Sequence, residues 1–221
     1  MRDLMEKKKY PKQLSLRDIG VVIFIAEAGA VSLSTLSKVL EKKFQTPIEA
    51  RGLRALAHRL VEYGLISKER ILAETGSILW PTTEALKLAG FTVSRGERTD
   101  RPSLASLRHS LILAEVRLMY EIKGAKWTCE RALRSDFSEH LPDGLATFPD
   151  GNEVLIELEL TAKESNRLRN IMITNLESGN YLINYWTTPE TFSVVEKQKL
   201  NLPKDYQERV CIHLLPQEVY V

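Results

Sequence analysis

Four ionisable side chains between His140 and Lys163 have the types and the spacing that chemistry on a phosphate or a metal ion would need. Asp143 precedes one apolar stretch, Glu157 and Glu159 lie in the next, and Lys163 follows. Side chains two apart in a strand share a face, so the two glutamates should project together, with Asp143 beside them on a paired strand. Unpaired carboxylates are costly to bury. The pattern therefore predicts a metal ion, a basic partner or acid-base chemistry here.

Carboxylate oxygens are the ligands that Mg²⁺ prefers, so Asp143, Glu157 and Glu159 are candidate metal ligands. With Lys163 they are also the candidate catalytic residues. Mg²⁺ is the one cofactor this pattern implies, and only if the site is active. The alternative is that the three acids pair with a basic cluster such as Arg131, Arg134 and Arg167.

A second set of side chains has the pattern of a nucleic-acid contact. Between Arg51 and Arg59 the chain has three arginines, one histidine and no acid. At helical spacing the leucines form one face and the basic side chains the other, with Gly52 and Ala55 small enough to allow close approach to DNA. A solvated polar face is the alternative interpretation. The candidate DNA-binding residues are Arg51, Arg54, His58 and Arg59, with Lys68 and Arg70 on the following hairpin.

Composition limits the class of protein. The chain has 221 residues and a net charge of +2, with basic residues concentrated early and acidic residues near its centre. It has no apolar run as long as a membrane span and no signal-peptide core, and its two cysteines, Cys129 and Cys211, do not predict a disulfide framework or a zinc site. We therefore expect a cytoplasmic protein without a membrane partner.

The first half predicts helices that begin near Ser15, near Ser32 or Ser34, and after Pro47. A hairpin with strands around residues 65–66 and 78–80 follows, and then a helix capped by Thr82 or Thr83. This order resembles a winged helix-turn-helix domain, which implies that the third helix enters the major groove of double-stranded DNA.

The second half predicts a long helix over residues 103–122, a strand over 127–133, a hairpin of 145–148 with 154–160, a helix over 164–177, a strand over 181–186, a helix over 189–200 and a strand over 210–215. We expect an α+β protein: a winged helix-turn-helix domain over 14–91, a polar linker over 92–103, and a restriction-endonuclease-like α/β domain with a mixed sheet over 104–221.

The second half resembles the core of the PD-(D/E)xK nuclease superfamily, in which an Asp and a Glu on neighbouring strands hold Mg²⁺ and a Lys assists the attacking water. Pro142-Asp143 matches the first motif, and Glu157 stands at the acid of the second. The match then departs, because Glu159 and not a lysine stands two residues beyond Glu157. Lys163 lies further on. Either its side chain swings back toward the acids, or the residue belongs to the first turn of the next helix.

Residues 16–186 resemble the plasmid replication-relaxation family, which joins a winged helix to such a domain. The matching positions are His109, Trp127 with Glu130, Pro142-Asp143-Gly144 and Ile156–Thr161. The resemblance implies work on plasmid or integrative-element DNA. By itself, His109 is expected to be a core or domain-contact histidine rather than a base.

Two functions follow. The first is a sequence-directed, double-stranded-DNA-binding accessory or regulatory protein of a plasmid or other mobile element, with a degenerate nuclease-like domain. The second is a metal-dependent DNA endonuclease targeted by its winged helix. The missing lysine favours the first, and therefore a protein that is not an enzyme. A homodimer and protein partners in a mobile-element DNA-processing complex are further candidate assemblies.

Overall fold

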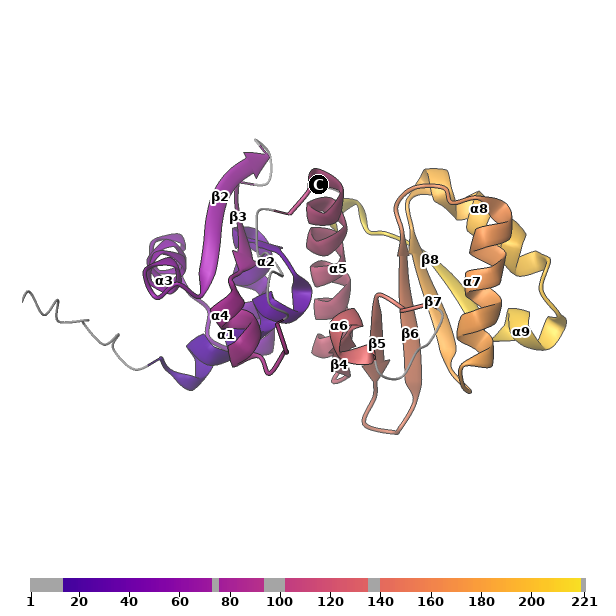
Figure 1. The fold of residues 1–221 in the computed structure, drawn as a ribbon, viewed down its shortest axis with the longest axis horizontal. Helices are drawn as coiled ribbons and strands as arrows, with labels where there is room; N and C mark the ends of the chain where they lie inside the picture. The colour runs from indigo at the N-terminus through magenta and orange to yellow at the C-terminus, as the bar shows by residue number, and fades with distance from the viewer. Residues whose placement is uncertain (1–13, 73–75, 94–101, 135–139, 220–221) are drawn as a thin grey trace, which may run out of the picture.

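The computed structural model describes residues 14–72, 76–93, 102–134 and 140–219, and it has an α+β architecture (Figure 1). The predicted fold class is confirmed at this level: helices accompany a small sheet in the first half and a mixed five-stranded sheet in the second. No helix among these residues is both long enough and apolar enough to cross a bilayer.

In the first half, capping side chains set where the helices begin. Ser15 and Ser32 accept hydrogen bonds from backbone N–H groups of their helices at 3.1 and 3.0 Å, as the sequence predicted, and Thr82 does the same at 3.4 Å. The elements in chain order are α1 (Leu16–Ala28), β1 (Val31–Ser32), α2 (Leu33–Lys38), the π-helical segment η1 (Val39–Lys43), α3 (Ala50–Glu62), β2 (Ile66–Leu72), β3 (Gly76–Pro81) and α4 (Thr83–Leu88).

The strands of the first half form an antiparallel sheet in the order β1-β3-β2. The hairpin of β2 and β3 was predicted, and its turn residues 73–75 lie outside the described residues. β1 was not predicted, because two residues carry no periodicity and its place is set only by pairing with β3, where Val31 is opposite Leu79.

The second half begins with the long helix and then builds the larger sheet. Its elements are α5 (Leu104–Ile122), β4 (Lys126–Cys129), α6 (Glu130–Leu133), β5 (Gly144–Thr147), β6 (Glu153–Glu159), α7 (Ser165–Glu177), β7 (Leu182–Thr187), α8 (Pro189–Leu200), α9 (Lys204–Glu208), β8 (Val210–Leu214) and the 3-10 turn η2 (Gln217–Val219). The sheet order is β4-β5-β6-β7-β8, antiparallel from β4 to β6 and parallel from β6 to β8.

One expectation for this half is wrong. The strand predicted over 127–133 ends at Cys129, and Glu130–Leu133 is helical as α6. The reason is the limited partner strand: Cys129 is opposite Gly144, the first residue of β5, so beyond it the described chain offers no strand to pair with. Gly144 is needed there because a Cβ atom would lie 2.1 Å from the Trp127 ring.

Helix α5 packs on both halves of the protein and lies between them (Figure 1). One side of α5 places Ala114 and Leu118 in the core of the first half, while Leu107 and Leu111 pack with Trp80. Its opposite side packs on the large sheet through a separate set of apolar side chains, Ile112, Val116 and Tyr120. Most of the linker predicted over residues 92–103 lies outside the described residues. The apolar packing nevertheless continues from one half of the protein to the other through α5.

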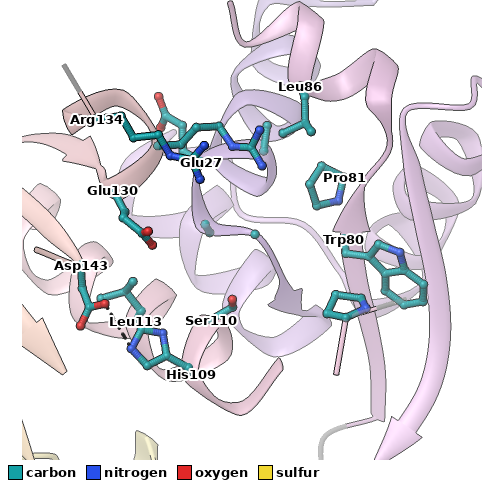
Figure 2. Close-up of a pocket in the computed structure, with 15 residues that line it drawn as sticks. Glu27, Trp80, Pro81, Leu86, His109, Ser110, Leu113, Glu130, Arg134 and Asp143 are labelled. Carbon is teal, nitrogen blue, oxygen red and sulfur yellow. Dashed lines mark ion pairs between the residues drawn. The ribbon is translucent and has the colours of Figure 1, made fainter. Parts of the chain in front are cut away.

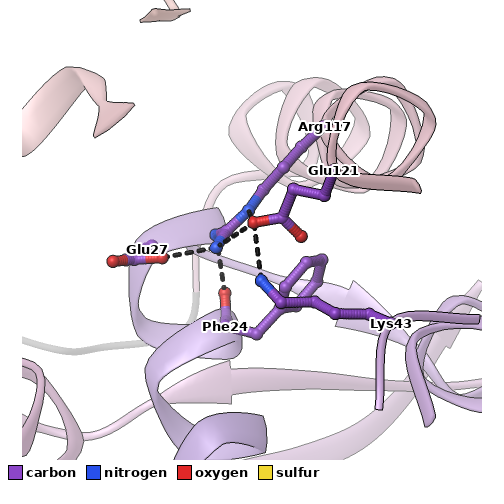
Figure 3. A network of polar contacts seen from close by, with 5 residues as sticks. All are labelled: Phe24, Glu27, Lys43, Arg117 and Glu121. Atoms are coloured by element: carbon purple, nitrogen blue, oxygen red, sulfur yellow. Dashed lines mark hydrogen bonds and ion pairs between the residues drawn. The ribbon is translucent and has the colours of Figure 1, made fainter. Parts of the chain in front are cut away.

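Arg117 of α5 is the polar centre of this contact (Figure 3). Its side chain is 3% exposed, and its guanidinium forms ion pairs with Glu27 of α1 and Glu121 of α5, donates to the Phe24 carbonyl oxygen at 3.3 Å and lies 4.2 Å from the centre of the Phe24 ring. Lys43 reaches the same Glu121 carboxylate at 2.6 Å. A buried cation is tolerated only when paired in this way, so these contacts fix α1 and η1 against α5.

We predict that Arg117→Met destabilises the protein by about 3–5 kcal/mol, because it removes the buried cation that Glu27 and Glu121 share and leaves Glu121 with Lys43 alone. The measurement is the free energy of urea-induced unfolding. Lys38→Met is the matched control: Lys38 also ties the halves together, through Glu115 at 2.9 Å, but it is 39% exposed, so its loss should cost at most about 1 kcal/mol. If the two variants lower the free energy of unfolding equally, the buried contacts of Arg117 stabilise the fold no more than the exposed Lys38–Glu115 pair does.

Candidate acidic site and basic helix face

The register of the large sheet brings Asp143, Glu157 and Tyr185 into one row. Gly144 is opposite Ile156 in the antiparallel pair of β5 and β6, so the next position sets Asp143 opposite Glu157. Glu157 is opposite Tyr185 of β7. Glu159 follows two residues later on the same face. The register therefore agrees with the predicted sharing of one face by Glu157 and Glu159, on the side of the sheet that α7 and α8 cover. Asp143 stands just before β5, and its carboxylate reaches α5.

Glu157 is buried and is bound through one carboxylate oxygen. His140 Nε2 lies 2.8 Å from its Oε1, and the Asn175 side-chain amide of α7 donates to the same oxygen at 2.7 Å. Burial raises the pKa of Glu157, against the effect of His140, and the nearby Asp143 raises it further. The interaction with Glu157 raises the pKa of His140, against burial. The raised pKa of His140 favours its protonated form, whereas the raised pKa of Glu157 favours its neutral form.

Glu159 is held by Lys163. The Lys163 ammonium lies 2.7 Å from Glu159 Oε2, although Lys163 belongs to the irregular segment between β6 and α7. Of the two positions considered for Lys163, swinging back toward the acids is therefore the one the structure shows. Burial raises the pKa of Glu159, while Lys163 opposes that rise.

Asp143 bridges the sheet and α5. Its Oδ2 accepts a hydrogen bond from the Leu158 backbone N–H at 2.7 Å, and its Oδ1 lies 3.3 Å from His109 Nε2. Burial alone would lower the pKa of His109, but its interaction with Asp143 outweighs burial and the pKa is raised. The sequence left His109 as a core or domain-contact histidine; in the structure its partner is Asp143, an acid of the candidate site in the same half of the chain.

Tyr185 and Asn175 complete the buried row. Both are fully buried, and the Tyr185 hydroxyl and Asn175 Oδ1 have no hydrogen-bond partner among the described residues. Burial raises the pKa of Tyr185 well above 10.0, and the charges of Glu157, Glu159 and Asp143 add to the rise. The phenol is therefore neutral and can act as a hydrogen-bond donor beside the acids.

Each of the three acids thus has its own basic partner: His109 for Asp143, His140 for Glu157 and Lys163 for Glu159. The arginine cluster considered as their partner does not take this role; Arg131, for example, lies over the Phe91 ring at 5.6 Å. His140 and Asn175 were not singled out by sequence reasoning. The spacing of His140 three residues before Asp143 was a usable signal, whereas Asn175 reaches Glu157 only through the packing of α7.

The carboxylates in this arrangement do not fit Mg²⁺ directly. Their oxygens are engaged by an imidazole, an ammonium, a side-chain amide and a backbone N–H. Within the described ranges no three His, Cys, Asp or Glu side chains gather so as to hold a metal ion. A divalent ion would have to displace the imidazoles of His109 and His140, so the ligand set Asp143, Glu157 and Glu159 stays a prediction.

The Asp143–His109 pair opens into a cleft of about 270 Å³ at the junction of the two halves (Figure 2). Glu27 of α1 and Trp80 of β3 line it from the first half, and Glu130 and Arg134 from α6 and its end. The acidic row is therefore approached from this cleft at Asp143, while its other end is closed by α7.

Helix α3 separates its apolar and polar faces as the sequence predicts. Leu53, Leu56, Ala57 and Leu60 are buried, while Arg51, Arg54 and His58 are exposed. Arg51 and Arg54 form no ion pair with any described residue, and His58 lies 3.5 Å from Glu62 in solvent. A Cβ at Gly52 would lie 2.7 Å from the Ile48 side chain, so its small size serves packing within the first half. The close approach to DNA expected of Gly52 stays a prediction.

The remaining basic candidates differ in their exposure and in where they lie. Arg59 is bound to Asp18 of α1 at 2.7 Å, so it ties α3 to α1. Lys68 and Arg70 are exposed on β2. The basic surface therefore consists of the α3 face, with the β2 side chains next to it, because α3 packs beside β2.

We predict that replacing His140 changes the pH dependence of stability. The pKa of His140 is raised above 6.5, so its charged form stabilises the fold below pH 6.5, and this contribution is lost as pH rises through the raised value. The raised pKa of Glu157 likewise makes the free energy of unfolding fall as pH rises above 4.5. The destabilisation by His140→Gln should thus be largest below pH 6.5 and shrink with rising pH, measured by urea unfolding across pH.

The matched control is His58→Gln, because His58 is exposed on α3 and its acid partner is in solvent. This variant should leave the pH profile of stability unchanged. A destabilisation by His140→Gln that is constant with pH would mean that the His140–Glu157 contact is not an ion pair.

Comparisons of the chain with protein-family models, with curated proteins and with solved structures gave no significant match. The resemblances described from the sequence therefore rest on their short motifs.

Proposed function

We propose that the protein is a double-stranded-DNA-binding accessory or regulatory protein of a plasmid or other mobile element. It reads the duplex with α3 and carries a nuclease-like second half that does not cleave DNA. The observation that carries the proposal is the outer face of α3, where Arg51 and Arg54 are exposed without an ion pair to any described residue. Exposed arginines without an ion pair can donate hydrogen bonds to guanine and can pair with phosphate.

The surroundings of α3 support a winged-helix role. The order helix, strand, helix, helix, hairpin, with β1 closing the sheet beside β3, is the arrangement in which a third helix enters the major groove. The hairpin carries Lys68 and Arg70 next to α3, where they can contact the backbone of the same duplex. Arg59 helps to orient α3 through Asp18 rather than by contacting DNA.

The arrangement of strands in the second half supports its assignment as nuclease-like. The pairing of its acidic side chains supports the assignment as inactive. Asp143 directly precedes β5 and Glu157 lies in β6, the antiparallel partner of β5, next to the parallel pair of β6 and β7; this arrangement is similar to the nuclease core that the sequence resembles. Each acid, however, is paired with a basic side chain of this chain. The mobile-element context comes from the resemblance carried by His109, Pro142–Gly144 and Ile156–Thr161.

A metal-dependent endonuclease is the second candidate function, and one observation favours it. Lys163 returns to Glu159, so an acid and a lysine stand together near Asp143 although the lysine is not two residues beyond Glu157. Activity would require that the two imidazoles give up their carboxylates to Mg²⁺. The residues of such a site would be Asp143 and Glu157 as ligands, with Lys163 as the basic group.

For DNA binding, we predict that the double variant Arg51→Ala/Arg54→Ala loses about 1–3 kcal/mol for each base contact removed, and that the salt dependence of its affinity becomes shallower. The measurement is fluorescence anisotropy with duplexes that the wild-type protein has enriched from a random pool.

The control is Lys197→Ala/Lys204→Ala, which removes the same charge from α8 and α9 at the opposite end of the molecule from α3 (Figure 1). It should retain wild-type affinity. If both double variants bind as the wild type does, and both remain folded by circular dichroism, α3 does not contact DNA.

For the second half, we predict that supercoiled plasmid stays intact when incubated with the purified protein and Mg²⁺ or Mn²⁺, because the carboxylates are occupied by cations. Asp143→Ala is the control for contaminating nuclease. Metal-dependent cleavage by the wild type that Asp143→Ala abolishes would instead establish the endonuclease.

A further inference from the structure

Strand β8 is an edge of the large sheet that no other described strand pairs with, and it carries no Asp, Glu, Lys or Arg. Its sequence is Val210-Cys211-Ile212-His213-Leu214. Burial and the nearby Lys123 lower the pKa of His213 below 6.5, so this side chain is neutral at physiological pH. Leu214 is 51% exposed and Cys211 is exposed with a free thiol. An uncharged, partly apolar edge is a surface to which another strand can add.

The other sheet edges among the described residues are protected. β2 carries Lys68, Glu69 and Arg70, β4 begins with Lys126 and is followed at once by α6, and β1 has only two residues. Charges and short length are the usual means by which natural proteins prevent edge pairing. β8 has neither, and also no proline, so it is the edge that the sequence leaves open to a partner.

The hydrogen bonds of β8 show which of its backbone groups face outward. Ile183 donates to the Arg209 carbonyl oxygen, and Leu215 donates to the Thr187 carbonyl oxygen. Odd-numbered residues therefore direct their N–H and C=O groups toward β7. By alternation, Val210, Ile212 and Leu214 direct theirs away from the sheet.

We propose that β8 pairs antiparallel with β8 of a second copy of this chain, about a two-fold axis through Ile212. In this register Ile212 is opposite Ile212, and Val210 is opposite Leu214. Every outward-facing residue then exchanges both backbone hydrogen bonds with an outward-facing residue of the other copy. A two-fold contact of this kind is self-complementary, so it closes the edge and adds no further copies.

The side chains favour a second copy as the occupant. In this register Leu214 lies diagonal to Ile212 of the other copy and on the same face, so its exposed side chain becomes covered. The two edges bring no like charges together, because β8 carries none. The pairing joins two large sheets into one continuous sheet and uses no residue of α3, so it is independent of the proposed DNA binding.

The first test is the molar mass in solution by light scattering across protein concentrations. The wild type should pass from the 25.2 kDa monomer toward twice that mass as concentration rises. Leu214→Lys should abolish the dimer, since each copy then brings a charge to the edge. Leu200→Lys is the matched control, because Leu200 is 64% exposed on α8 and outside the edge, and it should associate as the wild type does.

The second test fixes the register. Cys211 of one copy is opposite His213 of the other, at a non-hydrogen-bonded position where Cα atoms lie about 4.5 Å apart, which is within disulfide range. His213→Cys should therefore form a disulfide-linked dimer under mild oxidation, seen on non-reducing gels. The double variant His213→Cys/Cys211→Ser should not, because its two cysteines would lie diagonally across the axis.

A wild type that stays monomeric at the highest concentrations reached would overturn the proposal. A dimer that Leu214→Lys leaves intact would assign the contact to another surface. A dimer sensitive to Leu214→Lys, but without the disulfide in His213→Cys, would overturn the register through Ile212. DNA binding measured on Leu214→Lys separates this proposal from the one for α3, whose exposed arginines this variant does not alter.

Discussion

The burial of Arg117 between α1 and α5 is the interaction on which the arrangement of the two halves depends. A guanidinium that is 3% exposed must have its charge and its N–H groups satisfied, and Glu27, Glu121 and the Phe24 carbonyl oxygen provide this from two different elements. These partners exist together only when the first half is seated on α5. The exposed face of α3 and the acidic row of the large sheet are therefore parts of one packed structure, although the chain between them includes a polar segment.

The same physical rule accounts for the difference between the two candidate sites. Inside the second half, where Glu157 and Glu159 are almost fully buried, each acid is accompanied by a cation of the same chain. On α3, where water screens the charge, Arg51 and Arg54 have no ion pair with any described residue. Paired charges hold a structure together, whereas exposed unpaired ones remain available to a polyanion. This contrast is why we favour binding to DNA over its cleavage.

Whether a feature could be predicted from the sequence depended on how far apart in the chain the residues that determine it lie. The caps at Ser15 and Ser32, the buried face of α3 and the alternation that brings Glu157 and Glu159 together involve residues a few positions apart, and all could be predicted. β1 and the conversion of residues 130–133 into α6 could not, because pairing with distant strands decides both. Gly52 was assigned to the DNA surface because its small size was visible but its neighbour Ile48 was not.

By itself the sequence determined the α+β class, most of the element order and the acids that would share one face, because periodicity and capping act within single helices and strands. Only the tertiary structure decided which cations meet those acids. His109 comes from α5, His140 from the segment before β5, and Lys163 from beyond β6, and they meet the three carboxylates only after the sheet has formed on α5. The physical reason is that an ion pair depends on distance in space, which spacing along the chain does not fix once helices pack across a sheet.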